Sequence, residues 1–306
     1  MIVAFRDGRL EERLRTLAQF PALQRPAVRR VIIWIAVLAL LAGLVLAIRS
    51  QPDLLTDLSW PPIIAILLLA IPLVIGLNVV EYSLSGRMLG RRIGPLDSLE
   101  IVVVGAAANM LPIPGSTLVR MAALKAAGAG FGQGAMAVGL VFLVWLAVSA
   151  IYSGLWILLA GALWIGLVCV AAGLVMLALV VGGATRLERG QPTISWVVLV
   201  RIALVFVEGG RFYLTFLAFG IDASFAQSSA FVVTGVLGSA LSVVPAGLGL
   251  RETIAAALGP VVGIAAATGF LAAALNRVLD MTVVLPLAFL LALRRRNGGS
   301  PRSILA

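Results

Sequence analysis

The chain has 306 residues, of which 61% are hydrophobic and only 12% are charged, and its mean hydropathy is +1.12. Several apolar runs reach the roughly 20 residues that a helix needs to cross a bilayer, so the composition predicts an all-α polytopic membrane protein. The formal net charge is +10 and there is no histidine, which excludes imidazole metal sites. No cofactor is expected, and arginines that flank apolar runs are typical of membrane topology rather than of nucleic-acid binding.

The N-terminal part of the chain predicts a cytoplasmic segment followed by two spans. Residues 1–30 are rich in arginine and carry leucines at helical spacing, which favours an amphipathic helix on the membrane surface; a solvated basic tail is the alternative. Residues 31–48 predict an uncleaved first span, and residues 61–80 predict a second that continues toward Leu89. Glu81 lies near the inner end of this span, where a simple ion pair with Arg87 is one interpretation.

The next stretch predicts a broken helix. An apolar half at 99–111 meets the breakers Pro112 to Gly115, and a second short half follows with Arg120 and Lys125. Neither half is long enough to cross a bilayer alone. We expect a re-entrant helical hairpin that enters and leaves on the cytoplasmic side, with a single kinked span as the alternative.

Ordinary spans are predicted at 135–159, 163–181 and 195–219, the first two joined by a turn near Gly161. The third differs because it carries Arg201, Glu208 and Arg211 within an apolar run. Glu208 and Arg211 are three positions apart, so they share a helix face and can neutralise one another.

A second broken helix is predicted downstream. An apolar half at 231–244 meets the sequence PAGLGLRE, which is followed by a short half closed by Gly259 and Pro260. A long helix at 263–293 then contains Arg277 and Asp280, whose spacing favours a pair within one helix. The arginines after it indicate that residues 294–306 form a cytoplasmic tail.

The two breaks look like copies of one pattern, because Pro114 to Arg120 and Pro245 to Arg251 have the same internal spacing. Counting spans places the two blocks in opposite orientations, as in transporters built from inverted repeats. The predicted architecture is therefore a single domain at 31–293, with about six transmembrane helices and two oppositely oriented re-entrant hairpins. The repeats cover about 61–160 and 195–293.

Arginines and helix ends at each break would suit an anion, and the apolar walls favour the phosphate of a lipid. The alternative for the arginines is an internal salt bridge, most simply Arg251 with Glu208. The predicted substrate contacts are Asn109, Pro114, Gly115, Ser116, Arg120, Pro245, Gly247, Gly249 and Arg251. The predicted coupling or charge-balancing residues are Glu81, Glu208, Arg211, Glu252, Arg277 and Asp280.

Three motifs carry a resemblance to a known family: NMLPIPG before Arg120, PAGLGLRE at the second break, and NRVLD in the last helix. Together they resemble the integral membrane domain of the lysylphosphatidylglycerol synthase transmembrane family over about residues 63–293. In some members that domain is attached to an aminoacyl-lipid synthase, and it is implied to move the lipid product between leaflets. The first motif departs from the family, since Gly115, Ser116 and Thr117 stand where the family has a paired glycine and an acidic residue.

No synthase domain follows within this sequence, so the resemblance implies translocation without synthesis. We expect a non-enzymatic, flippase-like transporter in a bacterial or archaeal cytoplasmic membrane, with both termini in the cytoplasm. It would move a phospholipid, an aminoacyl-phospholipid or a polyprenyl-linked intermediate. Its partners would be membrane lipids and a separately encoded lipid-synthesising enzyme, and a homo-oligomer is compatible with the sequence. The alternatives are an ion-coupled carrier of small anions and a non-transporting scaffold for a lipid-modifying enzyme.

Overall fold

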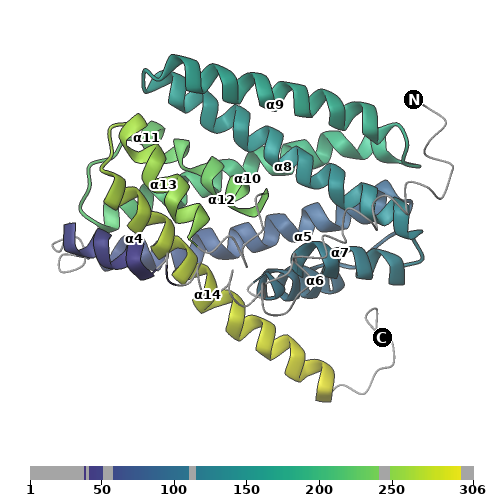
Figure 1. Ribbon diagram of the computed structural model, residues 1–306. Helices are drawn as coiled ribbons and strands as arrows, with labels where there is room; N and C mark the ends of the chain where they lie inside the picture. The colour runs from purple at the N-terminus through teal and green to yellow at the C-terminus, as the bar shows by residue number, and fades with distance from the viewer. Residues whose placement is uncertain (1–37, 39–40, 51–57, 110–114, 241–248, 298–306) are drawn as a thin grey trace.

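The computed structural model describes residues 38, 41–50, 58–109, 115–240 and 249–297, and all regular structure in these residues is helical (Figure 1). Five of the described helices are long and apolar enough to cross a membrane: Trp60–Met88, Phe131–Leu159, Leu163–Ala184, Gly190–Ala218 and Ala266–Arg294. They confirm an all-α multi-pass membrane protein and five of the predicted spans. The basic segment 1–30 lies outside the described residues, as does half of the first predicted span at 31–48. The described half consists of Leu38 and the part of the helix Leu41–Ser50 that falls within this span.

The first long helix consists of α4 (Trp60–Ala65), the π-helical turn η1 (Ile66–Ala70) and α5 (Ile71–Met88). Pro72 explains the π turn, because proline has no N–H to donate and its ring clashes with the carbonyl group four residues earlier. The Ile71 N–H bonds to the Ile66 carbonyl oxygen, five residues back. The wider turn thus lets the helix continue through the proline.

Four more long helices complete the set of candidate membrane spans. α8 (Phe131–Leu159) and α9 (Leu163–Ala184) lie side by side, joined at Gly161, whose φ of 91° reverses the chain (Figure 1). A Cβ atom at Gly173 would lie 2.7 Å from the Ala147 carbonyl oxygen, so glycine is needed for the close approach of the two backbones. α10 (Gly190–Ala218) and α14 (Ala266–Asn297) are the other two long helices.

Each predicted break is flanked by short helices that pack against each other. α6 (Pro95–Ala108) contacts α7 (Gly115–Ala126), and α12 (Val232–Ala240) contacts α13 (Leu250–Val261). The short helix α11 (Phe225–Ala230) precedes α12. The breaks themselves, at 110–114 and 241–248, lie outside the described residues, and re-entry at one membrane face stays a prediction.

One boundary differs from the sequence prediction. Pro260 does not close the second short half but lies inside α13, which continues to Val261. Because Pro260 belongs to the last turn, the helix loses only one intrahelical hydrogen bond to it.

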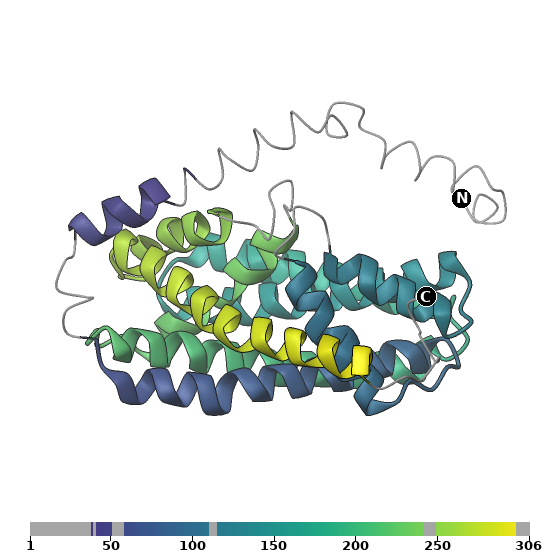
Figure 2. The same cartoon turned by 90° about the horizontal axis from the view of Figure 1, so that it is seen from below.

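The helix α4–η1–α5 and α10 lie side by side and antiparallel (Figure 2). The Ser59 N–H donates to the Ala218 carbonyl oxygen at one end (2.8 Å), and the Arg189 N–H donates to the Met88 carbonyl oxygen at the other (3.1 Å). Both helices are 29 residues long. The helices that lead the two predicted repeats therefore run in opposite directions, as an inverted repeat requires.

In each predicted repeat, the long helix that follows the break contacts a short helix of the other repeat. The long helix α8, which follows the first break, packs on α12 of the second helix pair, while α14, which follows the second break, packs on α6 of the first pair. Within each half, α7 contacts α8 and α13 contacts α14. Both pairs of short helices therefore contact α8 and α14.

Candidate functional site

Nine charged side chains on five of the helices are buried or partly buried, and we call them the charged cluster. They come from α5, α7, α10, α13 and α14. Its members are Glu81, Arg120, Arg201, Glu208, Arg211, Arg251, Glu252, Arg277 and Asp280. Charges inside a membrane domain are costly unless they are paired or bind a ligand, so the partners of each one decide its role.

The first group of the cluster centres on Glu81 of α5, which is fully buried. Its carboxylate accepts hydrogen bonds from Arg201 of α10 and, at 3.4 Å, from Arg120 of α7. The Arg201 guanidinium carbon also lies 5.3 Å from the centre of the Trp145 ring. Glu81 is thus neutralised by two arginines from other helices and not by Arg87 at the membrane interface.

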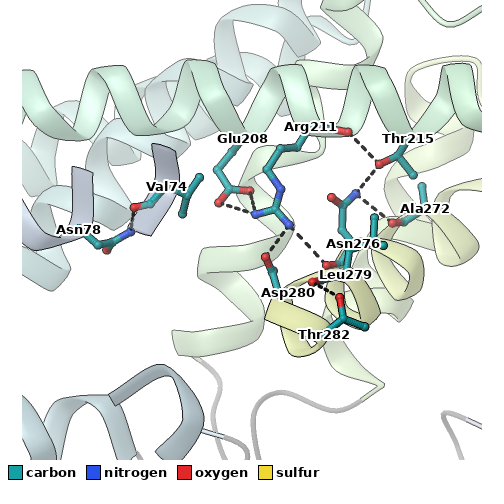
Figure 3. A network of polar contacts seen from close by, with 10 residues as sticks. All are labelled: Val74, Asn78, Glu208, Arg211, Thr215, Ala272, Asn276, Leu279, Asp280 and Thr282. Atoms are coloured by element: carbon teal, nitrogen blue, oxygen red, sulfur yellow. Dashed lines mark hydrogen bonds and ion pairs between the residues drawn. The ribbon is translucent and has the colours of Figure 1, made fainter. Parts of the chain in front are cut away.

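The second group centres on Arg211 of α10, which is 1% exposed. Its guanidinium binds Glu208 (3.2 Å), confirming that these two residues share a helix face, and it binds Asp280 of α14 (2.7 Å). Figure 3 shows both ion pairs together with Asn276, whose amide group donates to the Thr215 hydroxyl (2.9 Å). This group connects α10 to α14.

The third group consists of Glu252 on α13 and Arg277 on α14. The Glu252 carboxylate is fully buried, and its Oε1 lies 3.1 Å from Arg277 Nε. Arg277 and Asp280, expected from their spacing to form a pair within one helix, therefore each bind a charge on a neighbouring helix instead.

Arg251 of α13 differs from the other four arginines. Among the residues that the structure describes, no carboxylate lies within 4 Å of its guanidinium, so the alternative pairing with Glu208 is not formed. Its side chain lies along α12 beside Gly235 and Gly238, with the guanidinium carbon 5.9 Å from the centre of the Phe212 ring. Its Nε is buried and has no hydrogen-bond partner in the described part of the chain, a feature that it shares with Arg120, Arg201 and Arg211.

The glycine before α13 gives Arg251 its place near the break. Gly249 caps the helix in the left-handed conformation, with φ of 78°, which side chains disfavour. Its carbonyl oxygen accepts the Thr253 N–H (2.9 Å) and starts the helix. Arg251 is consequently in the first turn of α13, where free backbone N–H groups favour negative charge.

The predicted contacts at the first break have structural roles in this arrangement. The Asn109 side-chain oxygen accepts the Ser116 N–H (2.7 Å), which caps the first turn of α7. Gly115 is buried against α6, since a Cβ atom there would lie 2.2 Å from the Ala108 carbonyl oxygen. Pro114, Pro245 and Gly247 lie outside the described residues.

The sequence analysis did not include Arg201 among the site residues, although an arginine within an apolar span indicates a buried partner or a ligand. Nor did it predict the stacking of this guanidinium on Trp145. Within the described ranges, no group of three His, Cys, Asp or Glu residues could hold a metal ion.

A family model described as the lysylphosphatidylglycerol synthase TM region matches residues 31–288. The chain belongs to this family. The matched range includes all nine residues of the charged cluster, and the match confirms the expected family. No curated protein matches the chain. Membership of the lysylphosphatidylglycerol synthase TM family indicates a role related to membrane lipids.

Proposed function

We propose that this protein is a flippase-like transporter, which moves a phosphate-bearing lipid between the two leaflets of a membrane. The lipid phosphate would bind Arg251 at the second break and Arg120 at the first. The acyl or prenyl chains would stay in contact with the apolar outer faces of the helices. The protein would act without catalysis, on a lipid supplied by a separately encoded enzyme.

The observation that carries this proposal is that, in the described residues, no carboxylate lies within 4 Å of the Arg251 guanidinium. A guanidinium group in a membrane domain needs compensation, and a phosphate provides it with two parallel hydrogen bonds. The first turn of α13 adds backbone donors at the same place. A phosphate fits this position better than a metal ion or a neutral solute does.

A second observation supports movement rather than static binding. The helices that lead the repeats are antiparallel, and the two helix pairs contact the same central helices from opposite halves of the fold. Arg120 is partly exposed and shares Glu81 with Arg201, so it can exchange its carboxylate for a lipid phosphate while Glu81 stays neutralised. This gives the lipid one arginine in each repeat.

Reconstitution tests the proposal directly. Purified protein is placed in vesicles whose lipids include a fluorescent phosphatidylglycerol, and a membrane-impermeant reductant bleaches the outer leaflet. We expect faster leaflet exchange than in protein-free vesicles, and exchange lost in Arg251→Gln. The matched control is Arg87→Gln, because Arg87 is exposed and outside the charged cluster. Exchange that never exceeds the protein-free rate, across several headgroups, contradicts a flippase.

The same vesicles separate the alternatives. Uptake of a soluble phosphate ester that depends on a proton or sodium gradient, with no lipid exchange, would favour a carrier of small anions. A scaffold would show neither activity, and Arg251→Gln would leave its binding to a lipid-modifying enzyme unchanged. If the protein is a flippase, lipid exchange should occur without any soluble substrate.

A further inference from the structure

We infer that Asp280 and Asn276 of α14 form a second contact for the lipid headgroup, which accepts hydrogen bonds and selects phospholipids whose headgroups carry hydroxyl or ammonium donors. This inference rests on the proposed function and specifies its substrate class. It follows from two oxygen atoms, one helical turn apart, that have no donor in the described part of the chain.

The first acceptor belongs to Asp280, a partly exposed carboxylate in the middle of a helix. Asp280 is the central residue of the 29-residue candidate span Ala266–Arg294, and its side chain is 33% exposed. Its Oδ1 accepts a hydrogen bond from Arg211 (2.7 Å), but no described residue donates to its Oδ2. Glu208 differs, because its two oxygens lie 3.2 and 3.4 Å from the same Arg211 nitrogen. The Oδ2 of Asp280 is therefore open to a ligand.

The second acceptor belongs to Asn276, which lies one turn earlier on the same face of α14. Asn276 is 1% exposed, and its amide nitrogen donates to the Thr215 hydroxyl (2.9 Å) and to the Ala272 carbonyl oxygen (3.1 Å). A carbonyl oxygen only accepts, so these bonds fix which way the amide group points. Its Oδ1 is buried without a donor in the described residues and lies on the side that faces Arg211 (Figure 3).

These acceptors lie near the arginine to which the proposed function assigns the phosphate. Arg277, three positions before Asp280 on α14, interacts electrostatically with both Asp280 and Arg251. A lipid whose phosphate binds Arg251 would have the substituent of that phosphate near Asp280. The site then consists of a cationic part for the phosphate and an accepting part for the rest of the headgroup.

The accepting part determines which substituents fit. A carboxylate in the middle of a span is costly unless a polar partner contacts it, and hydroxyl groups, ammonium groups and water all donate to it. A methyl ester or a quaternary ammonium group displaces water without replacing its hydrogen bonds, which lowers affinity. One hydrogen bond to a charged acceptor is sufficient for about a tenfold difference.

The experiment compares two pairs of fluorescent lipids, labelled on an acyl chain and matched in headgroup charge within each pair. Phosphatidylglycerol and phosphatidylmethanol are both monoanions, but only the first carries hydroxyl donors. Phosphatidylethanolamine and phosphatidylcholine are both zwitterions, but only the first carries N–H donors. In the leaflet-exchange assay, we expect protein-dependent exchange of the donor-bearing lipid to be about tenfold faster within each pair.

Asp280→Asn tests the residue itself. Its side-chain oxygen can still accept from Arg211, which Glu208 continues to neutralise, while an NH2 group replaces the open oxygen. The preference within each pair should therefore disappear. The matched control is Asp222→Asn, the same change at an exposed loop position outside the charged cluster, which should keep the parent preference.

The outcomes separate this inference from the proposed function. A preference in one pair only supports the inference and identifies the donor as a hydroxyl or an ammonium group. Equal exchange within both pairs overturns the inference but leaves the proposed function intact, as does an Asp280→Asn protein that keeps the parent preference. The lipid comparison uses the parent protein, so it decides the question even if the variant does not fold. No protein-dependent exchange of any lipid overturns both.

Discussion

Arg201 of α10 and Glu81 of α5 form a buried ion pair between residues that are 120 positions apart in the sequence. The pair joins the two antiparallel helices that lead the repeats, and Glu81 extends it to Arg120 at the first break. A fully buried carboxylate that serves two arginines is more sensitive to substitution than either arginine, because its loss leaves two positive charges without a partner.

Replacing Glu81 should therefore destabilise the protein strongly. Glu81→Gln is expected to lower the free energy of unfolding by about 3–5 kcal/mol, measured by chemical unfolding in detergent. The double variant with Arg201→Gln should recover part of this loss, since only the partly exposed Arg120 then lacks its carboxylate. Glu188→Gln is the control, because Glu188 is exposed and outside the charged cluster. Additive effects in the double variant would contradict the coupling.

Arg251 and Arg277 should separate transport from stability. Arg277→Gln leaves the fully buried Glu252 without its cation and should cost about 3–5 kcal/mol of unfolding free energy. Arg251→Gln leaves no described carboxylate unpaired, so we expect a change within about 1 kcal/mol but a loss of lipid exchange. Unfolding in denaturant and the leaflet-exchange assay measure the two quantities on the same preparations. An Arg251→Gln protein as unstable as Arg277→Gln would make Arg251 a structural residue.

The spans, the short helices beside the breaks and the Glu208–Arg211 pair were predictable, because each depends on local composition or on spacing within one helix. The partners of Glu81 and Asp280 were not, because they come from helices distant in the sequence, and spacing carries no information on which faces meet. The charged cluster shows the same limit. Its nine residues can be read from the sequence, but only the packing of the helices identifies Arg251 as the arginine of the cluster with no described carboxylate within 4 Å.

Gly115 is expected to be intolerant of any side chain. A Cβ atom there would lie 2.2 Å from the Ala108 carbonyl oxygen and would push α7 away from the end of α6. Gly115→Ala should lower the midpoint of unfolding and reduce lipid exchange, because Arg120 is on the displaced helix. Gly139→Ala is the matched control, since a Cβ atom at this exposed position of α8 meets nothing within 4 Å. Normal lipid exchange by a Gly115→Ala protein would show that transport does not depend on the close packing of α6 and α7.

Ser153 of α8 is predicted to stabilise the bend between α11 and α12. Its hydroxyl accepts the Val233 N–H (3.0 Å) and donates to the Ser229 carbonyl oxygen (3.4 Å), two groups that would bond to each other in a continuous helix. The inserted hydroxyl thus satisfies both backbone groups where the helix is interrupted. Ser153→Ala would leave them buried and unpaired, which should cost about 1–3 kcal/mol of unfolding free energy. Ser239→Ala, which removes an exposed hydroxyl from α12, should change it by less than about 0.5 kcal/mol. Equal effects of the two substitutions in denaturant unfolding would show that the bend does not depend on the Ser153 hydroxyl.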